Sequence, residues 1–360
     1  MSTSVHAQIF DGPGRPLRPE QRALPAALAP GEILVAIQLA TICGSDLHTL
    51  AGHRTESTPC ILGHEAVGRV VDLGPGRDDL RIGDRLTWSI ADSCGTCPAC
   101  TAHRLPEKCR HLFKYGHASL ADGSGLNGCY ASHILLRPGT RVVKIDDALP
   151  DAVVAPANCA LATAVNAISH LPDPCRVVAI QGAGLLGVYS CALLKERGVE
   201  HIFCIDVNQA RLAQATRFGG IAIDGRPERY AQTRCQIEEI APGGVDAVLE
   251  VAGVSALVPE GVRLLRPGGF YAFVGMVHPG TALDLTGEQI IRKCLTIRGV
   301  HNYSPGHLER AVEFLGQTAA KYPYAALVSP PHPLAALEEA VQLAQTQQYF
   351  RVSVQPQEQS

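Results

Sequence analysis

RVVAIQGAGLLGVYSCALLKERG, residues 176–198, decides the fold of this 360-residue chain. An apolar run that predicts a strand leads into Gly182, Gly184 and Gly187, and a helical pattern follows these three glycines. In a G-x-G-x-x-G loop the first glycine permits a tight turn, the second lets the backbone approach a pyrophosphate, and the third allows close helix packing. We therefore expect a dinucleotide to bind here, around Leu185, where the helix N-terminus offers free N–H groups to phosphates.

Asp206 ends the next predicted strand, HIFCID. An acidic residue at this point accepts hydrogen bonds from ribose hydroxyl groups and repels a 2′-phosphate, which favours NAD over NADP. An ordinary carboxylate at a strand end is the alternative. Arg211 complicates the choice, because an arginine near this position can accommodate a 2′-phosphate.

Strand and helix patterns alternate from Cys159 to Gly299, which predicts βαβ units and a parallel sheet. Before Cys159, short apolar stretches are broken by Gly and Pro, as is typical of a β-rich domain. After Gly299 two helical runs and a short strand return to that first domain. We expect an α/β fold with a β-rich domain of residues 1–160 and 299–360. Residues 161–298 would form a nucleotide-binding domain with a doubly wound parallel sheet.

Four cysteines are grouped in the stretch SCGTCPACTAHRLPEKC, at Cys94, Cys97, Cys100 and Cys109. Three thiols spaced by two residues and a fourth farther on can close a tetrahedron around one zinc ion, which makes a structural site. A disulfide knot is the alternative. The absence of a secretory signal disfavours it, because Cys-x-x-Cys runs in a reducing compartment favour metal. We call residues 94–109 the cysteine lobe.

Composition argues against several classes of protein. The net charge of -3 gives no electrostatic reason to expect a nucleic acid or an anionic membrane as partner. The N-terminus lacks the basic segment and apolar core of a signal peptide. No apolar run approaches the ~18 residues that span a bilayer. We expect a cytoplasmic protein that acts on a small molecule.

Cys43 in TICGSDLH, His64 in ILGHEAVG and Cys159 in APANCALA are further candidate metal ligands. A catalytic zinc usually has three protein ligands and one open position. Each residue alone would more often be a buried cysteine or a core histidine. Together with the cysteine lobe and the glycine loop, they resemble the zinc-dependent medium-chain alcohol dehydrogenase family. The resemblance covers nearly the whole chain and implies a GroES-like catalytic domain beside a Rossmann domain.

The resemblance implies a role for each motif residue. The three ligands would hold a catalytic zinc, and the cysteine lobe a second, structural zinc. Asp46 would support a ligand, and Glu65 would be a nearby carboxylate able to ligate the metal transiently. Ser45 would contact the zinc-bound oxygen, and His48 would pass its proton to solvent. Two departures are a longer gap before the last lobe cysteine and the strand NGCYASHILL, whose pocket-facing side chains differ.

The implied reaction is hydride transfer between an alcohol, or its aldehyde or ketone, and NAD. The resemblance also implies a homodimer or homotetramer, joined at a sheet edge near residues 268–277. Three alternatives are a binding relative without chemistry, a zinc-free reductase of the same superfamily, and a zinc lyase or hydrolase.

Residues 39–49 and 112–133 resemble a bacterial subgroup proposed to serve phosphonate catabolism. Arg54, Lys114 and His117 could contact an anion, or could be ordinary solvated or structural residues.

Overall fold

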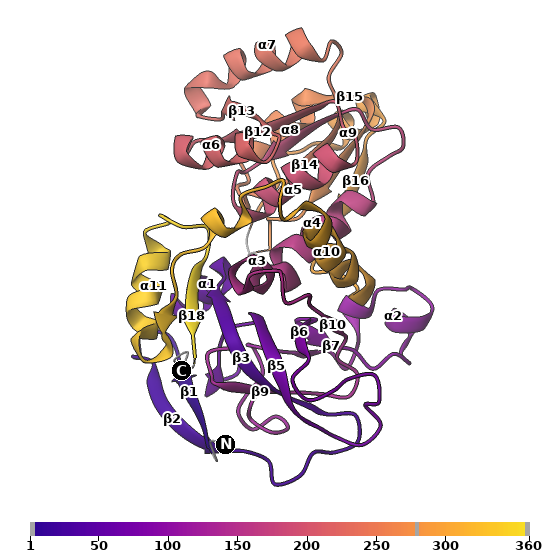
Figure 1. Cartoon of the computed structure of the whole chain (residues 1–360). Helices are drawn as coiled ribbons and strands as arrows, with labels where there is room; N and C mark the ends of the chain where they lie inside the picture. The colour runs from indigo at the N-terminus through magenta and orange to yellow at the C-terminus, as the bar shows by residue number, and fades with distance from the viewer. Residues whose placement is uncertain (1–3, 278–280, 357–360) are drawn as a thin grey trace. The chain divides into compact units, whose positions relative to one another are not determined.

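The computed structural model describes residues 4–277 and 281–356 and shows two compact units (Figure 1). The first unit comprises the described residues up to Cys159 and those from Ser304 onward, and the second comprises Ala160–Tyr303. The chain therefore leaves the first unit after Cys159 and returns to it at Ser304.

The second unit is built on a six-stranded parallel sheet. Its strands are β11 (Val177–Gln181), β12 (His201–Asp206), β13 (Ile221–Asp224), β14 (Val245–Glu250), β15 (Leu265–Phe273) and β16 (Thr296–Gly299). Their spatial order is β13-β12-β11-β14-β15-β16. When β11 is counted as the first strand, this order is 3-2-1-4-5-6, which is the strand order of dinucleotide-binding domains. The glycine loop follows β11, where the strand order reverses, and ligands bind at that point in such sheets.

Helices precede and connect these strands (Figure 1). They are α4 (Ala160–Ser169), α5 (Leu185–Glu196), α6 (Gln209–Arg217), η3 (Pro227–Arg229), α7 (Tyr230–Ile240), α8 (Leu257–Leu264) and α9 (Gly287–Lys293). The central strands are apolar at nearly every position, and Val245, Ala247, Val248 and Leu249 of β14 are fully buried. Such runs are typical of a parallel sheet that is covered on both faces.

The sheet edge expected near residues 268–277 is an interior strand, and that expectation was wrong. β15 pairs with β14 on one side and with β16 on the other, where Phe270 lies opposite Thr296. The short run TIRG, residues 296–299, forms β16, whose backbone groups pair with β15 in parallel. The edge strand on this side is therefore β16.

The first unit has a seven-stranded sheet of order β10-β6-β5-β3-β18-β17, with β9 also paired to β3, and a three-stranded sheet of order β2-β1-β4. The larger sheet contains β3 (Ile33–Ile42), β5 (Glu65–Leu73), β6 (Arg85–Trp88), β9 (His133–Leu136), β10 (Val142–Lys144), β17 (His332–Pro333) and β18 (Val352–Gln355). The smaller sheet contains β1 (Ser4–Phe10), β2 (Arg18–Ala23) and β4 (Cys60–Ile61), and β7 (Ala91–Asp92) pairs separately with β8 (Phe113–Lys114).

Helices of the first unit are α1 (Gly44–Leu50), α2 (Pro98–Thr101), η1 (Pro106–Lys108), α3 (Asp151–Val154), η2 (Ala155–Asn158), α10 (Pro305–Thr318), η4 (Tyr324–Leu327), η5 (Leu334–Ala336) and α11 (Leu337–Gln345). The long strand β3 is buried along most of its length, and β18 pairs with it in an antiparallel manner. The predicted fold class is thus confirmed, with a β-rich unit and a parallel α/β unit.

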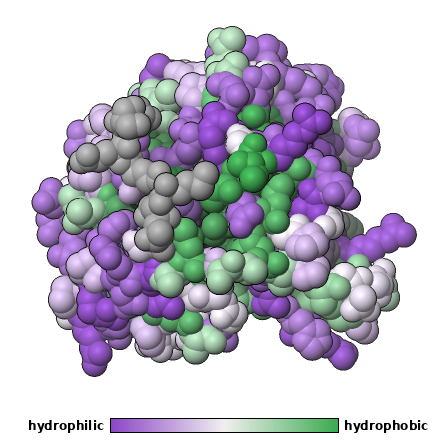
Figure 2. All heavy atoms as spheres, turned by 60° about the horizontal axis from the view of Figure 1, so that its bottom comes forward, coloured by the Kyte–Doolittle hydropathy of each residue, from purple (hydrophilic) through white to green (hydrophobic). Residues whose placement is uncertain are grey.

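Polar residues predominate on the face seen in Figure 2, around an area of apolar residues. Among residues 4–277 and 281–356, no single helix is long and apolar enough to cross a membrane. One bent pair, Asp151–Asn158 with Ala160–Ser169, passes that test by length and composition only.

Candidate functional site

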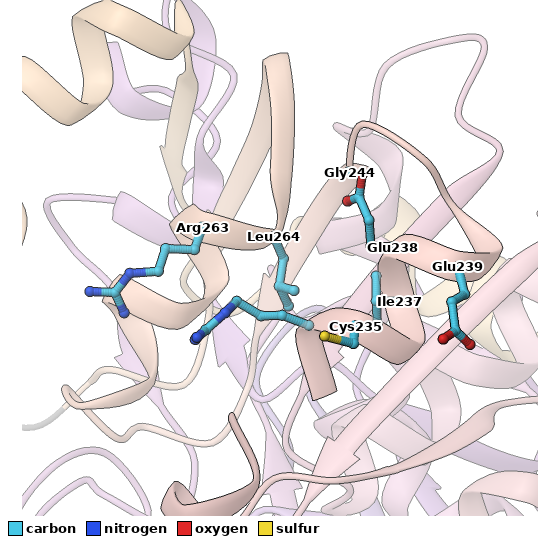
Figure 3. A pocket seen from close by; sticks show the side chains of 8 residues that line it. Cys235, Ile237, Glu238, Glu239, Gly244, Arg263 and Leu264 are labelled. Carbon is cyan, nitrogen blue, oxygen red and sulfur yellow. The ribbon is translucent and has the colours of Figure 1, made fainter. Parts of the chain in front are cut away.

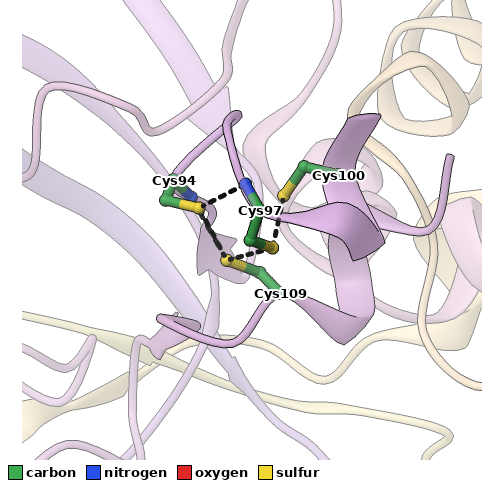
Figure 4. A group of neighbouring side chains, drawn as sticks. All are labelled: Cys94, Cys97, Cys100 and Cys109. Carbon is green, nitrogen blue, oxygen red and sulfur yellow. Dashed lines mark hydrogen bonds between the residues drawn. The ribbon is translucent and has the colours of Figure 1, made fainter. Parts of the chain in front are cut away.

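The thiols of the cysteine lobe point toward one another (Figure 4). Sulfur–sulfur distances are 3.4 Å between Cys94 and Cys109, 3.6 Å between Cys97 and Cys100, and 3.9 Å between Cys97 and Cys109. All four are free thiols and form no disulfide. A tetrahedral zinc with bonds of about 2.3 Å places its sulfur ligands about 3.8 Å apart. The lobe therefore fits one zinc ion.

Short helical turns hold these thiols in place. Cys97 precedes α2 and Cys109 follows η1. The N–H of Cys97 donates to Cys94 Sγ at 3.4 Å, and the N–H of His111 donates to Cys109 Sγ at 3.3 Å. Hydrogen bonds from the backbone N–H and side chain of Thr96 lower the pKa of Cys94 to about 5. These donors favour the thiolate form, which is the form that binds a metal.

A second ligand group consists of Cys43, His64, Glu65 and Cys159, and one ligand atom of each lies within 4.8 Å of the others. Cys43 precedes α1, His64 precedes β5, and Cys159 follows η2. The first two meet because β3 and β5 are antiparallel neighbours, with Thr41 opposite Glu65. The structure thus brings together the three ligands suggested by the sequence.

Buried contacts position the chain around His64. The side-chain amide of Asn158 donates to the carbonyl oxygens of His64 and Trp88, each at 2.9 Å. Gly63 has a φ of +86°, and a Cβ there would lie 2.7 Å from the ring of Tyr130. Only glycine fits this position, because another residue would be strained and would clash.

Asp46 supports two of the ligands from a fully enclosed position. Its Oδ2 accepts hydrogen bonds from the N–H of Cys43 at 3.0 Å and from the hydroxyl of Tyr130 at 2.9 Å. Its Oδ1 lies 3.5 Å from Nδ1 of His64. This contact favours a proton on Nδ1 and leaves Nε2 for a metal.

The titratable side chains of this group shift one another's pKa values. Burial opposes a positive charge on His64, but the Asp46 carboxylate and the Cys43 thiol raise its pKa to about 10. A hydrogen bond from Cys159 and the nearby Arg351 guanidinium lower the pKa of Cys43, whereas that of Cys159 is raised by its contact with Cys43. In the absence of a metal the group therefore favours a protonated imidazole and a thiolate at Cys43. A metal would bind the thiolate directly and would displace the proton from Nε2 of His64.

Arg351 is a residue that the sequence analysis missed. Its guanidinium contacts both carboxylate oxygens of Glu65, at 2.7 and 2.9 Å, and its Nη2 lies 3.5 Å from Cys43 Sγ. Thr41 also donates to Glu65 at 2.6 Å. Burial raises the pKa of Glu65 to about 7, although Arg351 opposes the shift. An arginine within the apolar run FRVSV was the available signal.

Ser45 and His48, the predicted proton relay, lie on α1 directly after Cys43. Residues three apart on a helix are neighbours on its surface. Both side chains are partly exposed, and the ring of His48 lies 5.8 Å from that of His53 between centroids. Their helix therefore links the ligand Cys43 to solvent.

The glycine loop has the geometry that its spacing predicts. Gly182 has a φ of +113°, and a Cβ at Gly187 would lie 2.0 Å from the carbonyl oxygen of Gly182. A Cβ at Gly184 would meet nothing within 4 Å. The loop thus needs its first and third glycines for packing, and the second leaves open space before Leu185 begins α5.

Asp206 closes one side of a hollow of about 440 Å³ that is also lined by Gly182, Gly184, Arg211 and Tyr230. Its Oδ2 accepts the N–H of Ala183 at 2.7 Å, and its Oδ1 accepts the N–H of Asn208 at 2.8 Å. Both bonds fix the carboxylate beside the glycine loop. Arg211 lines the same hollow, so the acidic and the basic residue both face the expected nucleotide site.

Another hollow of the second unit lies between α7 and α8 (Figure 3). Its rim carries Arg234 and Arg263, and both are ion-paired with Glu260. Cys235, which is exposed, also lines it. Both arginines are thus paired and, within the described ranges, the hollow holds none of the candidate metal clusters, so we assign no chemistry to it.

Comparison with known proteins gives two family matches. Residues 29–147 match the family described as alcohol dehydrogenase GroES-like domain, and residues 186–317 match the family described as zinc-binding dehydrogenase. A similar sequence is L-threonine 3-dehydrogenase of Idiomarina loihiensis, 30% identical over 280 residues, covering 75% of this chain and 76% of the relative.

Solved structures are also similar. An alcohol dehydrogenase of Thermotoga maritima superposes with a TM-score of 0.93 at 30% identity, covering 99% of this chain and 100% of that one. A zinc-binding dehydrogenase of Sinorhizobium meliloti, bound to NADP, has a TM-score of 0.85 at 24% identity over 99% of this chain and 100% of that one. At 24% identity, the similarity to the Sinorhizobium meliloti structure shows a shared fold only.

Proposed function

The chain belongs to the zinc-dependent medium-chain alcohol dehydrogenase family, and we propose that it transfers hydride between an alcohol, or its aldehyde or ketone, and NAD(H). The observation that carries this proposal is the convergence of Cys43, His64 and Cys159 in a chain that also holds a complete dinucleotide loop. A lyase or hydrolase would have no use for that loop. A zinc-free reductase would have no use for the three ligands.

The ligand group fits a catalytic zinc. Its ligand atoms lie within 4.8 Å of one another, and the Asp46 contact leaves Nε2 of His64 free to bind. Zinc held there supplies a Lewis acid that polarises a carbonyl or acidifies an alcohol. Arg351 balances the charge of Glu65 next to it, so the carboxylate can stay ionised although it is fully buried.

The chain's own groups handle the proton. Ser45 accepts the hydroxyl proton of the alcohol, and His48, one helical turn later, passes it toward solvent. The nicotinamide supplies the hydride chemistry. Loss of any of the three metal ligands therefore removes a different part of the same reaction than loss of Ser45.

We further propose that NAD is the preferred cofactor. Asp206 is held beside the glycine loop by two backbone N–H groups, where its charge opposes a 2′-phosphate. Asp206→Ser should narrow or reverse the preference in kcat/KM, since Arg211 would then face the phosphate alone. An unaltered enzyme that already prefers NADP would contradict this assignment.

The assembly we propose is a homodimer or homotetramer, with β16 as its pairing edge, because an exposed strand edge offers unpaired backbone groups. Light scattering at micromolar concentration should return a multiple of the 38.2 kDa chain mass. A monomer would contradict the assembly and leave the reaction untouched.

The decisive experiment combines metal analysis with absorbance of NADH. Protein purified without chelator should hold two zinc ions per chain and reduce NAD in the presence of a panel of alcohols. Removal of zinc should abolish turnover, and added zinc should restore it. Full activity without zinc would refute the proposal.

A further inference from the structure

A charged group lies beside the catalytic ligands of the first unit, made up of Arg54, Glu56, Lys114 and His117. The ring of His117 lies 5.3 Å from that of His64 between centroids. The preceding Gly116 packs so closely that a Cβ there would lie 2.5 Å from the carbonyl oxygen of Gly63. The segment that carries Lys114 and His117 thus forms a wall next to the metal ligand.

Glu56 already has its partners. Its Oε1 lies 2.7 Å from Nδ1 of His117 and 3.0 Å from Nε of Arg54. Because a carboxylate only accepts hydrogen bonds, Nδ1 of His117 carries a proton in this contact. Nε2 of His117 is buried without a hydrogen-bond partner, and His117 as a whole is 8% exposed. A buried nitrogen of this kind is usually satisfied by a ligand or by water.

Lys114 completes the group without a direct contact to it, since the Glu56 carboxylate acts on its ammonium only through charge, in the direction that raises its pKa. Its side chain is half-buried, and within residues 4–277 and 281–356 its ammonium makes no hydrogen bond or ion pair. Burial and the neighbouring Arg54 charge lower its pKa. The group therefore holds two cationic side chains and one carboxylate. Charged groups that leave water are normally paired, so this excess of positive charge calls for an anion.

We propose that the alcohol oxidised by this enzyme carries an oxyanion a few atoms from its hydroxyl group, and that Lys114 binds this oxyanion together with Arg54. The inference rests on the proposed dehydrogenase function. Carboxylate, phosphate and phosphonate share the required chemistry. Nε2 of His117 can accept a hydrogen bond, so it would favour an anion that still bears a proton, such as hydrogen phosphonate, over a carboxylate.

Matched alcohols test the proposal on the zinc-loaded enzyme. We would compare butan-2-ol, 3-hydroxybutanoate and 2-hydroxypropylphosphonate with NAD. At least one anionic alcohol should exceed butan-2-ol in kcat/KM by about 10- to 100-fold, the usual value of a charged hydrogen bond. The better of the two anionic alcohols identifies the anion. Equal or better turnover of butan-2-ol would overturn the anionic subsite while leaving the dehydrogenase function intact.

Variants then assign the effect to residues. We would make Lys114→Gln and, separately, Arg54→Gln, which lies on a more exposed segment. Each variant should lower the ratio of kcat/KM for an anionic alcohol to kcat/KM for a neutral alcohol about tenfold or more. The matched control Lys321→Gln removes an exposed lysine of the same unit and should leave this ratio unchanged. Lys114→Glu should instead favour the cationic 1-aminopropan-2-ol. A ratio that is equal in all variants would refute the role of Lys114.

A binding measurement separates this inference from the proposed function. Methylphosphonate or acetate should raise the melting temperature of the zinc-loaded protein by mass action, and Lys114→Gln should remove that rise. If the enzyme oxidised no alcohol at all, the proposed function would fail and this melting experiment would still decide the subsite. No stabilisation by either anion would overturn it.

Discussion

The two metal-ligand groups of the first unit differ in how the chain supplies them. The cysteine lobe takes four thiols from one short segment, and backbone N–H groups of that segment contact the sulfurs. The second group takes Cys43, His64 and Cys159 from three separate segments, and buried side chains orient them. A local site is fixed by spacing, whereas a dispersed site depends on the whole fold around it. The proposed proton relay of Ser45 and His48 belongs to the dispersed site, because both residues follow Cys43 on α1.

Removing one ligand from each group should separate the two roles most sharply. Cys43→Ser should lower kcat/KM by at least about 10²–10³-fold, since it weakens the group that stabilises developing charge. Its melting temperature should stay near that of the unaltered protein. Cys97→Ser should lower the melting temperature much more, because structural zinc contributes directly to folding.

Metal analysis, activity and thermal unfolding of both variants check this comparison. Each variant should lose one zinc ion of two. A Cys97→Ser protein with unaltered melting temperature would show that the lobe is not structural.

Proton transfer is a second property that should distinguish the dispersed site from the lobe. Ser45→Ala should lower kcat for alcohol oxidation about 10²–10⁴-fold, the usual contribution of acid–base groups. His48→Gln should have a smaller effect that a buffer base partly restores. Zinc content should stay at the unaltered value in both, because neither residue is a ligand. Loss of zinc from either variant would instead move that residue into the ligand set.

The supporting side chains of the dispersed site should have an intermediate effect. Tyr130→Phe removes the hydroxyl that donates to Asp46, and such partners of ligands typically affect metal affinity or activity by about 10- to 100-fold. We expect zinc affinity at this site to fall by about tenfold. The matched control is Tyr115→Phe, which removes a buried hydroxyl bonded to Thr140. Equal zinc affinity in both variants, measured with a competing chelator, would mean that Asp46 does not need Tyr130.

The smallest expected effect concerns protons in place of zinc. The pKa of His64 is about 10 in the folded chain, against about 6.5 for an unperturbed histidine. Its proton therefore stabilises the fold fully below pH ~6.5, and that contribution is lost as the pH rises toward 10. Chelator-treated protein should lose a few degrees of melting temperature over this window relative to His64→Gln treated alike. Zinc-loaded protein should show no such loss, and parallel curves for the two chelator-treated proteins would refute the pairing of His64 with Asp46.

Sequence patterns predicted what short spacing controls. The glycine loop, the cysteine lobe and the alternating strands are each encoded within about 20 residues, so periodicity and spacing reveal them. The fold class was confirmed. The roles of Ser45 and His48 stay predictions, although the structure places both on α1 after a ligand.

Other features depend on contacts that no local pattern encodes. Arg351 meets Glu65 across 286 positions of sequence, because β18 returns to pair with β3. The run TIRG is too short to predict as the edge strand, so the edge was assigned to residues 268–277. Likewise, Asn158 reads as one polar residue in an apolar stretch, and only tertiary structure shows its two buried carbonyl partners.

The pairing of β18 with β3 has a consequence for how the protein matures during translation. A nascent chain that has just emerged past Cys159 already carries the three proposed metal ligands, yet it lacks Arg351. In the complete fold, that guanidinium opposes the rise in pKa that burial causes at the Glu65 carboxyl. When β18 docks on β3, the guanidinium arrives and the carboxyl can ionise beside Cys43. We therefore expect the charge balance of this ligand group to be completed late in synthesis, and a product that stops before residue 351 to lack it.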